Sequence, residues 1–231
     1  MKLSKTKVFA LALAVCLIAI LSMGSLAWFT DEDAVTNDFF IAGSDDEQDP
    51  DKVFSVDVWE DATSTDTDNE TKYEHLEYPA ILPGDDLYKE VNIENTGAYA
   101  QYIRAIVTVS DASIWQQLHG ETYVPLNKIA TDLNDKFDTW SIVYNTTEDT
   151  LTYVLYFDGI LLPETTKDIV TLFTNIEIPT AMTRDQAAAM AGGFVINVKA
   201  DAVQTEHVGD TAPEAFATVG MAIAAGNSTI S

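Results

Sequence analysis

Cysteine is almost absent from this chain of 231 residues: the only one is Cys16, which lies inside an apolar run near the N-terminus. No cysteine follows residue 27. Disulfide bonds, thiolate zinc sites and cysteine nucleophiles are therefore excluded from the rest of the chain.

Basic residues are also scarce. Lys and Arg total 12 against 37 Asp and Glu, which gives a formal net charge of −25 at pH 7. Three of the lysines (Lys2, Lys5 and Lys7) stand at the very start, so the remainder is more acidic still. Such a surface repels phosphate backbones, and we expect no nucleic-acid partner. The charge fits a soluble extracellular protein, or one that binds cations.

Recognisable catalytic motifs are missing as well. The sequence has no H-E-x-x-H, no G-x-S-x-G, no P-loop and no G-x-G-x-x-G. Its histidines, His75, His119 and His207, are too far apart in sequence to form a recognisable metal pair. A Ser-His-Asp triad needs no neighbouring residues, so the sequence does not test that arrangement. We predict that the protein is not an enzyme and assign no catalytic residue.

Residues 1–27 have the layout of a secretory signal peptide. The basic start MKLSKTK is followed by the apolar stretch VFALALAVCLIAIL (8–21) and by Ser25-Leu26-Ala27, a small-x-small cleavage site. We expect cleavage between Ala27 and Trp28. The alternative is an uncleaved anchor, because residues 8–29 would span about 30 Å as a helix. Either way, the lysines before the apolar run place the remainder outside the cytoplasm.

The rest of the chain has the pattern of short strands separated by turns. Strands are expected at 38–43, 53–60, 82–97, 102–109, 139–159 (two), 168–179 (a pair or one bent strand) and 194–204. Helices are expected at 111–120, with Asp111 as N-cap and Gly120 as stop, at 183–193 with Thr183 as N-cap, and at 212–226. Because the helices fall in the connections, we predict a mainly β fold, an antiparallel β-sandwich.

Two groups of residues suggest a binding role. Asp66, Asp68 and Glu70 occupy positions 1, 3 and 5 of an acidic loop, with Glu77 at position 12, which is a calcium-like spacing. Position 6 is Thr71 rather than the glycine that an EF-hand turn needs. No other cofactor is expected. A set of aromatics could stack on a sugar or could fill the core, and strand spacing favours the core; it comprises Trp115, Trp140, Tyr144, Tyr153, Tyr156 and Phe157.

Three motifs, taken in order, resemble the TasA/camelysin family of Gram-positive exported proteins. They are AWFTDEDAVTNDFFIAG directly after the apolar run, ILPGDDLYKEVNIENTGAYAQYIRAIVTV (81–109) with its P-G-D, N-T-G and Y-I-R elements, and FVINVKADAVQTEHV (194–208). Precursors of this family are cut by a dedicated SipW-type signal peptidase. The acidic loops at 44–51 and 61–72 have no counterpart in the family pattern.

The resemblance implies a secreted, jelly-roll-like β-sandwich that assembles into extracellular fibres of a biofilm matrix. It divides the chain into a signal peptide (1–27), an N-terminal strand segment (28–43) and a sandwich domain (44–231). In such fibres one subunit donates its N-terminal strand to the next, and here the side-chain anchors would be Phe29, Phe39, Phe40 and Ile41. The alternative is that residues 39–42 fold back as the first strand of their own domain. A head-to-tail contact of this kind does not close, so it builds filaments.

The partners implied are other copies of the chain, the SipW-type peptidase and other matrix proteins, with the membrane involved only for the precursor. Two other interpretations stay open. One is a monomeric or accessory cell-surface module that binds sugar or calcium. The other is a camelysin-like surface metalloprotease, for which the sequence offers no recognisable zinc motif.

Overall fold

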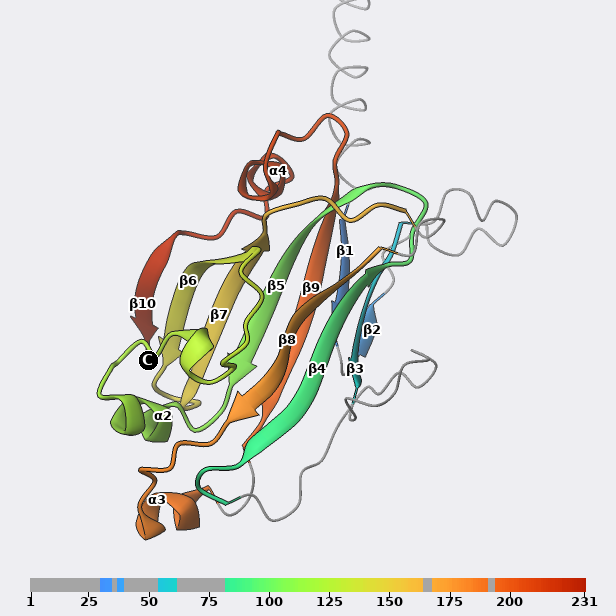
Figure 1. Cartoon of the computed structure of the whole chain (residues 1–231). Coiled ribbons are helices and arrows are strands. Elements are labelled where there is room, and N and C mark those ends of the chain that lie inside the picture. The colour runs from blue at the N-terminus through green and yellow to red at the C-terminus, as the bar shows by residue number, and fades with distance from the viewer. Residues whose placement is uncertain (1–29, 35–36, 40–53, 62–81, 164–167, 191–193) are drawn as a thin grey trace, which may run out of the picture.

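The architecture is a two-layer β-sandwich, seen in a computed structural model that describes residues 30–34, 37–39, 54–61, 82–163, 168–190 and 194–231 (Figure 1). Its strands are β1 (Thr30–Ala34), β2 (Asn37–Phe39), β3 (Val56–Asp61), β4 (Asp86–Asn95), β5 (Gln101–Val109), β6 (Phe137–Asn145), β7 (Thr150–Phe157), β8 (Ile169–Glu177), β9 (Ile196–Gln204) and β10 (Gly226–Ile230). Its helices are α2 (Ala112–His119), α3 (Arg184–Ala189), α4 (Ala212–Thr218) and the single 3-10 turn η2 (Leu126–Lys128).

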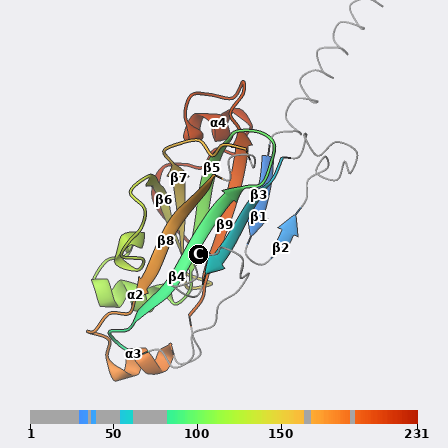
Figure 2. The same ribbon diagram turned by 45° about the vertical axis from the view of Figure 1, so that its right-hand side comes forward.

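The strands divide into a large and a small sheet. The large sheet has the order β10-β6-β7-β5-β9-β1-β2, and the small sheet has the order β3-β4-β8. The strand pairs are antiparallel apart from β10 with β6, which is parallel. The turned view in Figure 2 shows the small sheet lying across the large one. The predicted mainly β sandwich with short helices in its connections is confirmed.

Alternation along β5 and β9 explains why these two strands form the middle of the large sheet. Ile103, Ala105 and Val107 on β5 are fully buried in the core between the sheets, and Val198 and Ala200 on β9 join them there. Burial on one face in this pattern fixes the register, because a slip of one residue would turn every apolar side chain outward.

A second, smaller apolar cluster covers the opposite face of the large sheet, beneath α4. Tyr102 on β5, Tyr156 on β7 and Val203 on β9 pack there against Ala215 and Phe216 of the helix. The two central strands are thus buried on both faces, which accounts for the continuous burial of residues 101–105. α4 lies at one end of the sandwich, and α2 and α3 lie at the other (Figures 1 and 2).

The helix termini confirm some capping predictions and correct one. Gly120 ends α2 in the left-handed conformation, and Thr183 forms a capping box with Gln186 at the start of α3, both as expected. Asp111 stands at the N-cap position of α2, but its side chain makes no capping bond. Its φ of 56° is left-handed, whereas a capping side chain needs the extended backbone that Thr183 adopts.

The predicted C-terminal helix over 212–226 is wrong in its second half. α4 ends at Thr218, and Gly220 follows with a φ of +81°. The chain then turns back and runs as strand β10 along β6. The segment 168–179, for which a strand pair and one strand were both open, is the single strand β8.

Candidate functional site: the outer edges of the large sheet

The two ends of the chain supply the two outer edges of the large sheet. β1 and β2 come from the N-terminal segment and lie at one edge, while β10 comes from the C-terminal residues and lies at the other (Figure 1). Outer strands carry backbone N–H and C=O groups that a further strand can pair with. These edges are therefore where this fold can meet a partner through strand pairing.

The N-terminal edge is an antiparallel pairing of β1 with β9. It runs from Thr30 opposite Val203 to Ala34 opposite Lys199 without a register break. β2 then pairs back onto β1, with Phe39 opposite Glu32. β1 and β2 thus form an antiparallel pair that extends the sheet beyond β9.

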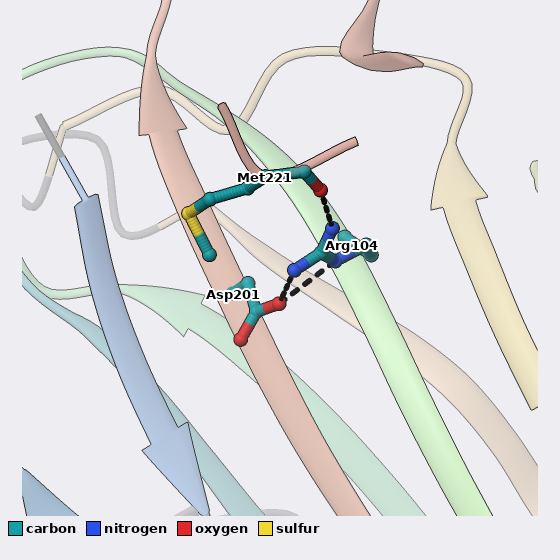
Figure 3. Close-up of polar contacts among 3 residues, drawn as sticks. All are labelled: Arg104, Asp201 and Met221. Carbon is teal, nitrogen blue, oxygen red and sulfur yellow. Dashed lines mark hydrogen bonds and ion pairs between the residues drawn. The ribbon is translucent and has the colours of Figure 1, made fainter. Parts of the chain in front are cut away.

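A buried ion pair joins β5 to β9, next to this edge. Arg104 on β5 stands opposite Asp201 on β9, and Asp201 stands opposite Glu32 on β1. The Nε atom of Arg104 donates to Oδ2 of Asp201 at 2.7 Å, and its Nη2 atom pairs with the same oxygen (Figure 3). Arg104 and Asp201 are 4% and 2% exposed. Arg104, Asp201 and Glu32 therefore occupy neighbouring positions across β5, β9 and β1.

The same arginine reaches the segment that leads to the other edge. Its Nη1 atom donates to the backbone oxygen of Met221 at 2.6 Å (Figure 3), and its guanidinium carbon lies 4.5 Å from the ring centroid of Phe216. A planar guanidinium can satisfy a carboxylate, a carbonyl and an aromatic face together, which an ammonium group cannot. Sequence reasoning missed this residue, although an arginine inside the apolar strand YIRAIVTV is a visible signal.

The C-terminal edge is the parallel pairing of β10 with β6. Gly226 stands opposite Ser141 and Ile230 stands opposite Asn145, and the residues of β10 are exposed. Three side-chain contacts hold β10 and the segment that precedes it. Trp140 Nε1 donates to the Ile223 oxygen at 2.8 Å, Thr146 Oγ1 donates to the Ile230 oxygen at 3.1 Å, and the Tyr123 and Thr229 hydroxyls lie 2.8 Å apart.

A second buried ion pair lies in the small sheet. Lys89 on β4 pairs with Glu60 on β3, and their exposed fractions are 7% and 2%. Burial lowers the pKa of the Lys89 ammonium, and the Glu60 carboxylate opposes that shift. Among the described residues the second carboxylate oxygen of Glu60 has no hydrogen-bond partner. The pair lies on the same side of its strands as Val58 and Val91, so its role is within the core rather than at a surface.

Most of the site residues expected from sequence lie outside the described residues. These are Ala27 and Trp28 at the predicted cleavage site, Phe29, Phe40 and Ile41 of the donor segment, and Asp66, Asp68, Glu70 and Glu77 of the calcium hypothesis. Phe39 is the last residue of β2. β1 and β2 pair within their own chain, and the alternative in which residues 39–42 fold back as a first strand concerns residues that, apart from Phe39, lie outside the described part of the chain.

The aromatic set is largely core. Trp115, Tyr153 and Phe157 are buried between the sheets, and Tyr156 is buried under α4. Tyr144 is half-buried, so Trp140 is the exposed member. Because the set is divided between the two faces of the sheet, it forms no platform on which a sugar could stack.

The described part of the chain gives no sign of a metal centre. His119 stacks on Trp115 with the ring centroids 6.4 Å apart, and His207 lies in the turn after β9. Burial lowers the pKa of the His119 imidazole, and the charge of Lys128 adds to that shift. Within the described residues no group of three or more His, Cys, Asp or Glu side chains is placed to hold a metal ion. Within those residues, too, no helix is both long enough and apolar enough to cross a bilayer.

The fold defines a class: a β-sandwich whose large sheet has N-terminal strands at one outer edge and a C-terminal strand at the other. Comparisons with protein-family models, with curated proteins and with solved structures find no match.

Proposed function

We propose that this protein is a secreted structural subunit that assembles into extracellular fibres, with the N-terminal strand of one copy paired to the β9 edge of the next. The observation that carries the proposal is the pairing of β1 with β9, made by a strand from the N-terminal end of the chain. The same strand from another copy can take this register residue for residue, because domain swapping replaces a contact within one chain by an identical contact between chains.

The resemblance to the TasA/camelysin family supports the same function. It adds that a SipW-type signal peptidase cuts the precursor between Ala27 and Trp28, and that the product joins a biofilm matrix at the cell surface. Until that cut the donor strand stays attached to the membrane, so the precursor does not assemble. N-terminal sequencing of the secreted protein should begin at Trp28.

The charge of the chain sets the conditions for assembly. Three of the five residues of β1 are acidic, and the whole chain carries −25. Copies therefore repel one another, and we expect assembly to speed up when salt or divalent cations screen that charge.

A reversible disulfide tests strand donation directly. Ala34 stands opposite Lys199, so the variant A34C/K199C can lock β1 onto its own β9. The oxidised variant should stay monomeric in electron micrographs, and reduction should release filaments. The matched control is T108C/N197C, which joins β5 to β9 in the interior of the sheet and should assemble in both states.

Two results would contradict the proposal. Filaments from the oxidised A34C/K199C variant would show that β1 does not need to leave its own chain. A secreted chain that begins at Trp28 and forms no filaments at any salt concentration would favour a monomeric or accessory surface module.

A further inference from the structure

The C-terminal edge of the large sheet has features of a contact that can be exchanged between molecules. β10 is held at its edge mainly through its backbone, because its residues are exposed; Ile230, its only large apolar side chain, is 51% exposed. Its pairing with β6 is parallel, which is slightly less stable per residue than antiparallel pairing. Little apolar burial is therefore lost when β10 leaves β6.

Met221 and Ile223 pack against the second apolar cluster, but the chain after Ile223 can swing without rebuilding it. Gly220 and Gly226 bracket the segment before β10 with φ values of +81° and +103°. No atom lies within 4 Å of the place where a Cβ would be on either glycine. Between them the segment is held by the bonds from Arg104 to Met221 and from Trp140 to Ile223, both to backbone oxygens. A different path for residues 224–231 leaves α4 and its buried side chains in place.

The charge pattern points to a second copy as the partner. Residues 215–231 contain no charged side chain, and neither do residues 139–146, which include the part of β6 that β10 covers. Elsewhere the chain has 37 acidic residues, so two copies repel each other over most of their surface. The β6 edge and β10 are where two copies can approach without bringing carboxylates together. An uncharged outer strand also lacks the lysines and prolines that normally protect an edge from pairing with another chain.

We propose that β6 is a second self-association edge, and that copies of this chain exchange their C-terminal strands there. β10 of one copy lies on β6 of the other in the register seen within one chain, with Ser228 opposite Val143. The exchange goes beyond the proposed function, because it involves the opposite edge of the sheet and does not need β1 to be donated. Reciprocal exchange gives a closed dimer, and one-way exchange links filaments side by side.

Disulfide trapping between two different variants tests the exchange. One variant is C16S/V143C and the other is C16S/S228C, so each full-length chain carries a single thiol. The two are mixed at high concentration, equilibrated under reducing conditions and then mildly oxidised. A disulfide between a C16S/V143C chain and a C16S/S228C chain forms readily only when β10 of one copy lies on β6 of the other. On a non-reducing gel we expect this heterodimer at several times the level of the control.

The matched control replaces C16S/V143C by C16S/N197C. Asn197 is exposed on β9, which β10 does not contact, so its heterodimer with C16S/S228C measures random collision. A third variant, C16S/V143C/S228C, should form the disulfide within one chain at high dilution, which checks the register itself. A heterodimer no more abundant than the control, or a third variant that does not close on itself, overturns the proposal. The readout is a dimer band, so it does not depend on whether filaments form.

Discussion

Asp149 lies in the turn between β6 and β7, yet it caps helix α2. Its carboxylate accepts hydrogen bonds from the backbone N–H of Ser113 at 2.8 Å and from the Ser113 hydroxyl at 2.7 Å. Its backbone oxygen accepts a third from the N–H of Ala112 at 2.9 Å. The start of the helix is therefore fixed to a hairpin distant in sequence, and the cap that Asp111 was expected to provide comes from another strand connection.

Replacing Asp149 by glycine should destabilise the protein, whereas the same change at Asp111 should not. Both residues have left-handed φ values, 51° and 56°, which glycine adopts freely. D149G also removes the cap, so we expect a loss of about 1–2 kcal/mol in the free energy of unfolding. Among the described residues the Asp111 carboxylate accepts one side-chain bond, from the Ser110 hydroxyl, and this is what D111G removes. Urea unfolding of the two variants provides the comparison, and equal losses would contradict the assignment of Asp149 as the cap.

Removing one member of the buried Lys89–Glu60 pair should lower the free energy of unfolding strongly, whereas replacing both members should lower it little. K89M leaves a carboxylate in the core with no cation, and we expect a loss of about 3–5 kcal/mol. E60L/K89M removes both charges, and its stability should return close to that of the natural sequence, because buried ion pairs recover little of their desolvation cost. Urea midpoints of the natural chain, both single variants and the double variant complete the cycle. A double variant as unstable as K89M would mean that the pair itself stabilises the fold.

Arg104→Lys should loosen β10 more than it loosens the rest of the sheet. Lysine keeps the charge beside Asp201 but cannot also reach the Met221 oxygen with a planar fork. We expect faster amide hydrogen exchange in residues 226–230 than in the natural chain. Ile176→Val serves as the control, since it trims a core side chain at about 0.5–1.5 kcal/mol without touching the segment before β10. Equal exchange of β10 in both variants would contradict a tethering role for Arg104.

His119 should make the protein less stable as the pH falls below about 6.5. Its pKa in the folded state is lowered by burial, so the unfolded chain binds the proton first. Stability is then lost as the pH falls from the unfolded pKa towards the lower folded pKa. H119Q should show a smaller drop in urea midpoint between pH 8 and pH 5.5 than the natural chain. An unchanged drop would assign the acid sensitivity to other groups.

The strands were predictable because their apolar residues alternate against a solvated or polar face. β4 and β9 carry this period, β5 stands out by its β-branched residues, and the turn residues Pro83-Gly84 and Asn95 to Gly97 mark the ends of β4. β10 was missed for a related reason. Its sequence, GNSTI, has no apolar alternation, because the strand is exposed and is held by its pairing with β6 and by polar side-chain contacts.

The polar core groups were harder to predict. Lys89 falls on the inward side of β4 together with Leu87, Val91 and Ile93, but nothing near it in sequence names Glu60 as its partner. Arg104 and Asp201 are likewise brought together only by the pairing of β5 with β9. Such contacts depend on strand order, which local patterns do not determine. The functional expectations at residues 27–29, 40–41 and 66–77 concern parts of the chain outside the described residues, so they stay predictions.

The intrinsic fluorescence of Trp140 can report on the chain that leads into β10. Its indole N–H donates to the Ile223 oxygen and it is 36% exposed, whereas the indoles of Trp59 and Trp115 are buried in the described structure. A quencher such as acrylamide or iodide should therefore reach Trp140 well before those two. Its fluorescence would follow the path of the chain into β10 without a label, so that release of that end could be timed in a stopped-flow instrument.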